Sequence, residues 1–310
     1  MSNEMIPFLK PGRLPQDPIF IVGYPRSGTT LVQRLLATQA GLYTLPETHY
    51  FSVIEKEVEW ESEDHEHISA VSLPALFIRI QEKMGFRVSA SEIDELERRE
   101  EKKDLTSKAL FEWIVGRFLS SLHPALEAQP SFRWIEKTPH HANHLERIIQ
   151  LYPRMQALYI LRHPVPAIFS RKLKFPFNQE LPLDVLAKRW NRMVRNVERF
   201  QSAFARHLHV LRYEDLFIDL EKEFKDIGGF LPFTFNMKAV RRFQNGKEKR
   251  RESFLLPSET WKLADFRLRF TNTNDSYRDL FSGDDIAAIE AVVGENMKKY
   301  GYESYAKRVT

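Results

Sequence analysis

Two glycines, Gly23 and Gly28, enclose a loop whose residues are suited to bind an anion. The apolar run at 19–22 precedes the loop and predicts a short buried strand. The residues after the loop have helical apolar spacing, so the loop ends at a helix N-terminus. Backbone N–H groups and the helix dipole attract a phosphate or sulfate at such a place, and Arg26 adds a fixed cation. The alternative is an ordinary strand–turn–helix corner that carries a surface arginine.

The spacing of the two glycines is that of a Walker A loop, G-x-x-x-x-G, but the pair that should follow it is different. A Walker A loop continues with Lys and Ser or Thr, whereas this chain has Thr29 and Thr30. A nucleotide kinase or NTPase also needs an acidic Mg²⁺ ligand at the end of an apolar strand, and the sequence has no clear candidate. The P-loop kinases and NTPases therefore remain only an alternative class.

A second group of anion-binding side chains follows the buried strand predicted at 157–161. Arg162 stands just past the carboxyl end of that strand, where open α/β sheets bind ligands. Ser170 follows on the next predicted helix, and Lys174 comes one turn later. A guanidinium and a hydroxyl that converge there predict a second phosphate site, separate from the loop at Arg26. Alternatively, Arg162 lies on the surface and Ser170 caps a helix.

Four segments of the chain resemble the sulfotransferases that use 3′-phosphoadenosine 5′-phosphosulfate (PAPS). Their 5′-phosphosulfate loop is similar to PRSGTT, and their 3′-phosphate motif is similar to ILRHPVPAIFSRKLK. EKTP and LRYEDL resemble two further segments of these enzymes, and the resemblance covers about residues 19–216. It implies a PAPS-dependent sulfotransferase that releases 3′,5′-ADP and requires no metal ion.

The resemblance also implies which residues bind the cofactor. They are Arg26, Ser27, Gly28, Thr29 and Thr30 at the 5′-phosphosulfate, Arg162, Ser170 and Lys174 at the 3′-phosphate, and Tyr213 beside the adenosine. For Tyr213 the alternative is a buried tyrosine with a structural hydrogen bond. Two polar stretches, 244–247 and 267–269, are candidates to close over the nucleotide, although neither reproduces a family pattern.

Glu47 is the predicted general base. The Glu-Thr pair that it begins stands 21 residues after Arg26 and resembles the tyrosylprotein sulfotransferases, in which that glutamate is the proposed base. A hydroxyl acceptor loses a proton as it attacks, and a carboxylate beside its oxygen can take that proton. His49 and His141 are expected to contact the acceptor. Alternatively, His49 assists the base or lies on the surface without a role.

Lys137 and Arg26 are the other predicted catalytic residues. Related sulfotransferases carry a lysine in an E-K-[ST]-P context beside the sulfuryl group, and EKTP places Lys137 there. Its ammonium, with Arg26, would neutralise charge on the sulfuryl oxygens and on the leaving phosphate. The alternative is a salt bridge with Glu136 at the end of a strand.

The strands and helices predicted from the sequence would bring these candidate site residues to one edge of a sheet. Apolar runs predict strands at 19–22, 42–45, 132–137, 157–161 and 208–213, and helical spacing predicts helices at 142–151, 165–173, 183–204 and 284–300. The alternation predicts an α/β fold with a central parallel sheet, helices on both faces and a P-loop-like beginning. Residues 1–310 are expected to form a single domain with a helical insert at about 52–130.

The composition excludes several other classes. The formal net charge of +4 does not indicate a nucleic-acid surface, and the absence of cysteine excludes disulfides and thiol chemistry. No apolar run reaches the length of a membrane span, and the first residues lack a signal-peptide pattern. A cytoplasmic location is therefore expected.

The predicted reaction is an in-line transfer of the sulfuryl group from PAPS to a hydroxyl of a small-molecule or carrier-bound acceptor. A P-loop kinase or NTPase is the first alternative. A non-catalytic nucleotide-binding module is the second, and only the charged segment at about 52–130 points to it. The composition of that segment does not select among sugar, phenol, lipid and carrier-bound hydroxyls.

Overall fold

The computed structural model describes residues 14–57, 89–102, 104–123, 126, 131–247, 270–276 and 278–306. Five strands of this part form a sheet in the order β2-β3-β1-β4-β5, and the pairs β2–β3 and β4–β5 run parallel. The strands are β1 (Ile19–Gly23), β2 (Leu42–Thr44), β3 (Arg133–Glu136), β4 (Gln156–Leu161) and β5 (Leu208–Arg212). The predicted α/β fold with a central parallel sheet is confirmed.

The chain divides into two compact units. Unit 1 comprises residues 1–19, 40–155 and 249–268, and unit 2 comprises residues 20–39, 156–248 and 269–310. The β2–β3 pair belongs to unit 1, and the β4–β5 pair belongs to unit 2. The organisation of residues 1–310 as a single domain stays a prediction.

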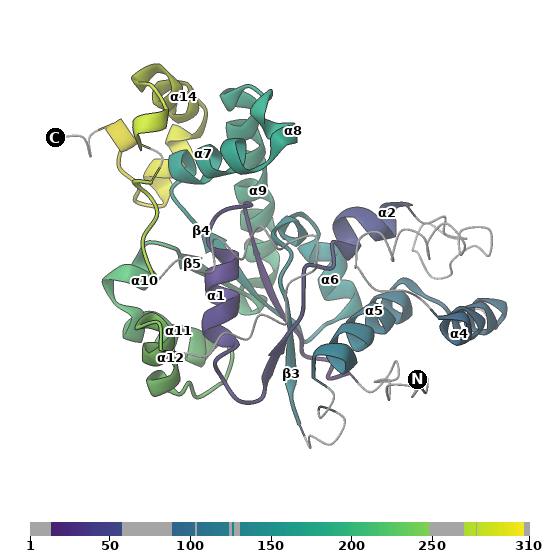
Figure 1. Cartoon of the computed structure of the whole chain (residues 1–310). Helices are drawn as coiled ribbons and strands as arrows, with labels where there is room; N and C mark the ends of the chain where they lie inside the picture. Colours follow the sequence, from purple (N-terminus) through teal and green to yellow (C-terminus); the bar gives the residue numbers. More distant parts are fainter. Residues whose placement is uncertain are drawn as a thin grey trace. The chain divides into compact units, whose positions relative to one another are not determined.

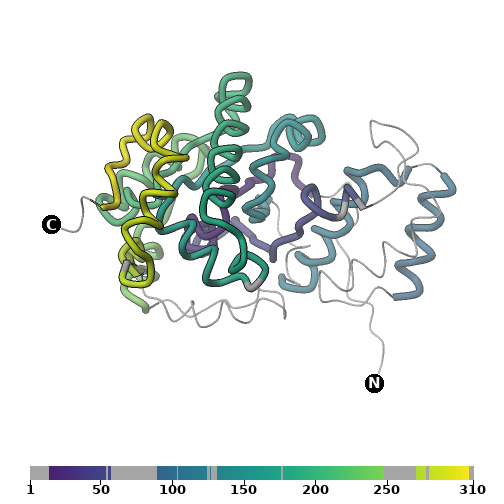
Figure 2. Tube along the Cα trace, turned by 90° about the horizontal axis from the view of Figure 1, so that it is seen from above, coloured from purple at the N-terminus to yellow at the C-terminus, as the bar shows by residue number. Residues whose placement is uncertain are grey.

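Unit 1 packs its helices around a cluster of aromatic side chains. Its helical segments are η1 (Tyr50–Ile54), α2 (Glu55–Glu57), α4 (Ala90–Glu101), α5 (Ser107–Leu122), η4 (Pro139–Asn143) and α6 (Leu145–Leu151). Phe111 of α5 is fully buried, and its ring centroid lies 4.9 Å from that of Tyr50 and 5.9 Å from that of Trp134 on β3. Arg117 of α5 pairs with Glu92 of α4 at 2.6 Å, and the two helices lie side by side in Figures 1 and 2.

Unit 2 is built on the buried strand β4 and a group of helices. They are α1 (Thr29–Leu36), α7 (Pro164–Lys174), α8 (Pro176–Gln179), α9 (Leu183–Phe204), η5 (Ala205–His207), α10 (Asp215–Ile218), α11 (Leu220–Phe230), α12 (Met237–Gln244), η8 (Arg278–Leu280) and α14 (Gly283–Lys299). β4 and β5 are in register from the pair Ala157 and Leu208 to the pair Leu161 and Arg212. The helices α7, α9 and α14 pack against one another (Figure 1) because each buries an apolar stripe.

The predicted elements agree closely with the structure, with one exception. Each predicted strand matches an observed one to within one residue at either end, and so do the helices predicted at 165–173, 183–204 and 284–300. The helix predicted from 142 begins later, at Leu145, because residues Pro139–Asn143 form a 3₁₀ turn. The backbone N–H of His141 bonds the carbonyl of Thr138 at 3.0 Å, which is the tighter 3₁₀ spacing.

The helical insert predicted at about 52–130 is described only in part. α4 and α5 lie within it and are helical, whereas residues 58–88 and 127–130 lie outside the described residues. The insert therefore stays a prediction. Among the helices of the described ranges, none is both long enough and apolar enough to cross a membrane.

The loop between β1 and α1 requires glycine at two positions. Gly28 is the N-cap of α1 with φ 97° and ψ 11°, in the left-handed region. A Cβ atom at Gly28 would lie 2.3 Å from a ring carbon of Tyr213, and one at Gly23 would lie 2.6 Å from the carbonyl oxygen of Ile160. The two glycines thus allow the loop to approach β4 and Tyr213 closely.

Replacing Gly28 by alanine should destabilise the protein. The left-handed conformation alone costs about 1–2 kcal/mol for a residue with a Cβ atom, and the contact with Tyr213 adds to that cost. Gly229→Ala is the matched control, because this exposed glycine of α11 has no atom within 4 Å of its Cβ position. Urea denaturation should show a loss for Gly28→Ala and a neutral or stabilising effect for Gly229→Ala. Equal stability of the two variants would contradict this account of the loop.

Candidate active site

The anion loop of unit 2 has the backbone geometry that an anion site needs. Arg26 has φ 75° and Gly28 has φ 97°, so two residues of the loop are left-handed. For a non-glycine residue this conformation costs about 1–3 kcal/mol and is found mostly at functional sites. No acidic residue stands in the first turn of α1, and Gly28 caps it without a side chain. The N–H groups and the dipole of α1 can therefore face an anion.

Ser27 supplies a second observation at the same loop. Its side chain is fully buried, and within the described residues its hydroxyl has no hydrogen-bond partner. A buried polar atom left without a partner is rare, because it costs the free energy of a lost hydrogen bond. Thr29 is also buried, and Thr30 is half-buried. The hydroxyl of Ser27 fits the oxygen of a bound phosphate or sulfate.

The two predicted anion groups form one cluster rather than two separate ones. Arg26 Nε donates to Ser170 Oγ at 3.0 Å, and Arg162 Nη1 donates to the backbone carbonyl of Arg26 at 2.8 Å. The two groups meet because β1 and β4 are neighbours in the sheet, so the residues that follow these strands lie close together. The binding of two separate phosphates by these residues stays a prediction. Lys174 ends α7 with an exposed side chain, and its role stays a prediction.

Arg162 is a buried cation of the cluster with several partners. It is buried, and its guanidinium lies 4.5 Å from the ring centroid of Tyr213. Its Nε donates to Asn274 Oδ1 at 2.7 Å, and its Nη2 donates to Thr273 Oγ1 at 3.0 Å. The hydroxyl of Tyr213 donates to the carbonyl of Thr271 at 3.2 Å. Tyr213 therefore lies in the cluster and also makes the structural hydrogen bond that was its alternative.

Sequence reasoning did not find Thr273, Asn274 or Glu214. Asn274 Nδ2 donates to Glu214 Oε1 at 2.8 Å, and the same oxygen accepts the backbone N–H of His163 at 3.0 Å. Tyr302 donates to the other oxygen of Glu214 at 3.0 Å. The polar run Asn272–Asp275 was the signal in the sequence for Thr273 and Asn274, and Glu214 stood within LRYEDL without a role assigned to it. The stretch 267–269, predicted to close over the nucleotide, lies outside the described residues. The stretch 244–247, the other candidate, begins at the last residue of α12 and is exposed.

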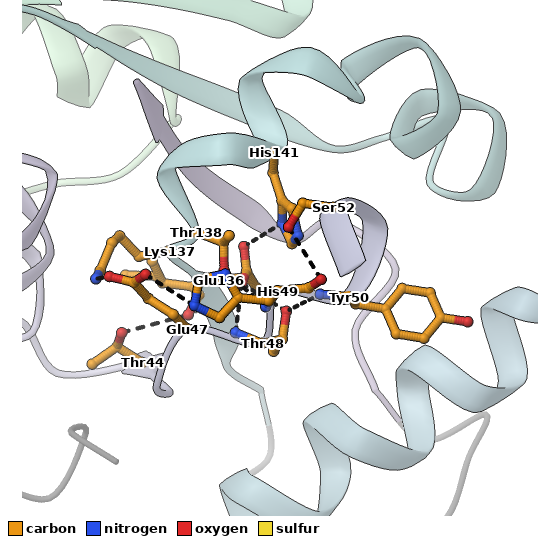
Figure 3. Close-up of polar contacts among 11 residues, drawn as sticks. Thr44, Glu47, Thr48, His49, Tyr50, Ser52, Glu136, Lys137, Thr138 and His141 are labelled. Carbon is orange, nitrogen blue, oxygen red and sulfur yellow. Dashed lines mark hydrogen bonds and ion pairs between the residues drawn. The ribbon is translucent and has the colours of Figure 1, made fainter. Parts of the chain in front are cut away.

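In unit 1, Glu47 and Lys137 form an ion pair (Figure 3). The ammonium of Lys137 donates to Glu47 Oε1, and His49 Nε2 lies 3.4 Å from Glu47 Oε2. The side chain of Lys137 is 2% exposed, that of Glu47 12% and that of His49 33%, so His49 is the member most open to a ligand. An ammonium beside a carboxylate stabilises the ionised form, which is the form that accepts a proton.

Glu136, the residue before Lys137, contacts two threonines and a histidine. Its Oε1 accepts hydrogen bonds from Thr48 Oγ1 at 2.9 Å and Thr138 Oγ1 at 2.6 Å, and its Oε2 lies 3.0 Å from His141 Nδ1. Burial acts to raise the pKa of Glu136, but the His141 imidazole and these hydroxyls outweigh burial and lower the pKa. His141 is itself fully buried, so its predicted contact with the acceptor remains a prediction.

The profile of the sulfotransferase family matches residues 18–236, which is more than half of the chain. The match includes the anion loop, Glu47, Lys137, Arg162, Ser170 and Tyr213. The chain belongs to the sulfotransferase family.

Solved structures support the fold of this sulfotransferase. The sulfotransferase domain from the curacin biosynthetic pathway matches with a TM-score of 0.57 and 18% identity, over 94% of this chain and 99% of that chain. The sulfotransferase domain of the Synechococcus PCC 7002 olefin synthase matches with a TM-score of 0.57 and 19% identity, over 97% and 99%. At these identities the likeness concerns the fold. No curated protein sequence matches significantly. In the described part of the chain, no group of three or more His, Cys, Asp or Glu residues is arranged to hold a metal ion.

The stability of this sulfotransferase should depend on pH through His144, the N-cap of α6. Burial, followed by the charges of His141 and Lys56, lowers the pKa of His144 to about 4. The unfolded chain has a histidine pKa of about 6.5, so between these values it binds more protons than the folded protein. Stability should therefore fall as the pH is lowered from about 6.5 to about 4.

His144→Gln removes this proton linkage. Urea midpoints at pH 7 and pH 5 should differ less for the variant than for the wild type, even if the variant is less stable at both values. An unchanged difference between the two midpoints would rule out His144 as a source of the pH dependence.

Proposed function

We propose that this sulfotransferase transfers the sulfuryl group of PAPS to a hydroxyl of a small-molecule or carrier-bound acceptor. The observation that carries the proposal is the cluster of Arg26, Arg162 and Ser170 beside the unpartnered hydroxyl of Ser27. Two guanidinium groups and a helix N-terminus match a nucleotide with anionic groups at both its 5′ and 3′ positions. The cytoplasmic location expected from the sequence stays a prediction.

The residues of unit 2 would hold the nucleotide. Ser27 and the N–H groups at Gly28, Thr29 and Thr30 bind the 5′-phosphosulfate, and Arg26 adds its positive charge. Arg162 and Ser170, with Lys174, bind the 3′-phosphate, and Tyr213 lies beside the adenosine. PAPS supplies an activated sulfuryl group on a phosphate leaving group. The fixed arginines occupy the place that Mg²⁺ has in NTPases, so transfer is expected without a metal.

The pair in unit 1 would act on the acceptor. Glu47 accepts the proton of the attacking hydroxyl, and His49, the more exposed neighbour, contacts or orients the acceptor. Lys137 neutralises charge on the sulfuryl oxygens and, with Arg26, on the leaving phosphate. The side chains of Glu47 and Lys137 are oriented before the reaction, which reduces the entropy cost of aligning the acceptor with the sulfuryl group.

The nucleotide assignment predicts a large preference for 3′,5′-ADP over 5′-AMP. Arg162→Ala should remove most of this preference, because a charged hydrogen bond to a phosphate contributes roughly 1.5–3 kcal/mol. Arg192→Ala, which replaces an exposed arginine of α9, is the matched control and should keep the preference. Calorimetry of both nucleotides with the three proteins measures the effect, and equal affinities in the wild type would refute the assignment.

The same nucleotides distinguish the alternative classes. A P-loop kinase or NTPase should be stabilised in a thermal-shift assay by ATP with Mg²⁺ more than by 3′,5′-ADP, whereas a sulfotransferase should show the reverse. A module that only binds nucleotide should respond to 3′,5′-ADP but transfer no label from PAPS in a screen of hydroxyl acceptors.

Replacing Glu47 by glutamine should slow transfer without weakening nucleotide binding. The amide keeps the shape of the side chain but accepts no proton at neutral pH, so kcat should fall by about 10²–10⁴. The loss should shrink for an acidic acceptor such as a nitrophenol, whose oxygen is already partly ionised. The affinity for 3′,5′-ADP serves as the internal control and should stay unchanged. Near-normal turnover of an aliphatic alcohol by Glu47→Gln would exclude the base role, and His49 would be tested next.

A further inference from the structure

One buried carboxylate in unit 1 is bonded to both loops that carry the Glu47–Lys137 pair. Glu136 is the last residue of β3 and has no exposed surface. Its Oε1 accepts the backbone N–H of Thr48 at 3.3 Å and the Thr48 hydroxyl at 2.9 Å, which holds the loop after β2. The same oxygen accepts the Thr138 hydroxyl at 2.6 Å, which holds the loop after β3. Figure 3 shows Glu136 among these residues.

The two loops also bond to each other at this point. The backbone N–H of His49 donates to Thr138 Oγ1 at 3.3 Å, and the backbone N–H of Tyr50 donates to Thr48 Oγ1 at 3.3 Å. Thr48 and Thr138 are fully buried, so their hydroxyls have to be satisfied by these contacts. Glu47 directly precedes Thr48 and Lys137 directly follows Glu136, so the same bonds fix the backbone on which the pair stands.

His141 closes the network from the opposite side. Its Nδ1 lies 3.0 Å from Glu136 Oε2, and its ring packs against Phe51 with centroids 5.1 Å apart. The ring has no exposed surface, and within the described residues its Nε2 has no hydrogen-bond partner. One ring nitrogen therefore serves Glu136, and the imidazole gives the buried carboxylate a further polar partner.

The backbone of His49 has a strained conformation, and the same hydrogen bonds hold it. His49 has φ 52°, a left-handed conformation that a residue with a Cβ atom adopts only when its surroundings hold it there. The N–H of His49 is bonded to Thr138, and its carbonyl accepts Ser52 Oγ at 3.2 Å and the backbone N–H of Val53 at 2.9 Å. The turn that presents Glu47 and His49 therefore depends on the loop that Glu136 anchors.

We propose that Glu136, which also contacts His141, is a positioning residue that holds Glu47 against Lys137 through Thr48 and Thr138. This inference rests on the proposed function for the roles of Glu47 and Lys137. Glu136 touches no reactant. It acts because its ionised carboxylate accepts bonds from both loops at once. Without that acceptor, the loop after β2 would lose two bonds to β3, and His49 would relax toward an ordinary conformation.

The test compares the chemical reactivity of the Lys137 ammonium among variants, because an ion-paired and buried amine reacts slowly. The probe is a trace of acetic anhydride, with acetylation of each lysine followed by mass spectrometry. Glu47→Gln removes the partner of Lys137 directly and sets the upper reference rate. Glu136→Met removes both acceptor oxygens of Glu136, whereas the amide oxygen of a glutamine would still accept the bonds of Thr48 and Thr138. Glu112→Met is the matched control, because Glu112 is a buried glutamate of unit 1 that bonds Gln16 and Tyr152 instead.

Glu136→Met should raise the acetylation rate of Lys137 about tenfold over wild type, toward the rate of Glu47→Gln; a tenfold change corresponds to about 1.4 kcal/mol. Glu112→Met should stay within about twofold of wild type. In the double variant, Glu136→Met should add little to Glu47→Gln, because it acts through Glu47. General loosening of the fold would instead raise the rate at most lysines and weaken 3′,5′-ADP binding, and that result would overturn the proposal.

Three other results would also overturn it. They are a wild-type rate at Lys137 in Glu136→Met, a full additional increase in the double variant, and a wild-type rate in Glu47→Gln. If Glu136→Met does not fold, Thr48→Val removes the hydrogen bond from the Thr48 hydroxyl to Glu136 at nearly constant volume, and a wild-type rate in that variant would count equally against the proposal. The labelling needs neither PAPS nor an acceptor, so its failure is separate from failure of the nucleotide and turnover tests of the proposed function.

Discussion

A charged side chain inside a protein must be surrounded by partners, because leaving water costs it several kcal/mol. Both clusters of this sulfotransferase depend on that constraint. Arg162 is buried with Asn274, Thr273 and the ring of Tyr213 around its guanidinium. Glu136 is buried with two threonines and a histidine around its carboxylate. Each charge therefore orders the backbone segments that supply its partners, and those segments carry the residues proposed to bind the nucleotide or to transfer the proton.

The same constraint explains why strained backbone occurs where it does. Arg26 and His49 both have positive φ, and each stands beside a network of hydrogen bonds. In the anion loop, the carbonyl of Arg26 accepts Arg162 Nη1, so a guanidinium holds the turned peptide in place. In unit 1, Thr138 accepts the N–H of His49. Strain at these positions fixes where the side chain points, which suits sites that must present charge before a ligand arrives.

Ser27 and Glu47 differ in whether their polar atoms have partners in the described part of the protein. The carboxylate of Glu47 already has the ammonium of Lys137 beside it, whereas the hydroxyl of Ser27 is buried without a partner among the described residues. An oxygen acceptor supplied by a phosphate or sulfate would satisfy that hydroxyl. The inference that this loop binds an anion is therefore supported by the structure itself as well as by the likeness to other sulfotransferases.

The sequence by itself determined the elements and the identity of the anion loop. Apolar runs and helical spacing are local properties, so β1, β4 and α9 could be predicted to within a residue. Glycine at position 28 likewise follows from a local requirement, its left-handed backbone at φ 97°. The need for glycine at position 23 comes instead from the close approach of Ile160 on β4. The turn at Pro139–Asn143 could not be predicted, because its 3₁₀ form includes a histidine that is bonded to Glu136.

Only the tertiary structure decided which side chains meet. Arg26 bonds Ser170, and Arg162 bonds Asn274, across separations of 144 and 112 residues. No local pattern records such pairs, because they depend on which strands are neighbours in the sheet. The same holds for Glu136, which the sequence presents only as a neighbour and alternative partner of Lys137. Its hydrogen bonds to Thr48, Thr138 and His141 arise because β2 and β3 pair in parallel, so that the loops after them leave the sheet at the same edge.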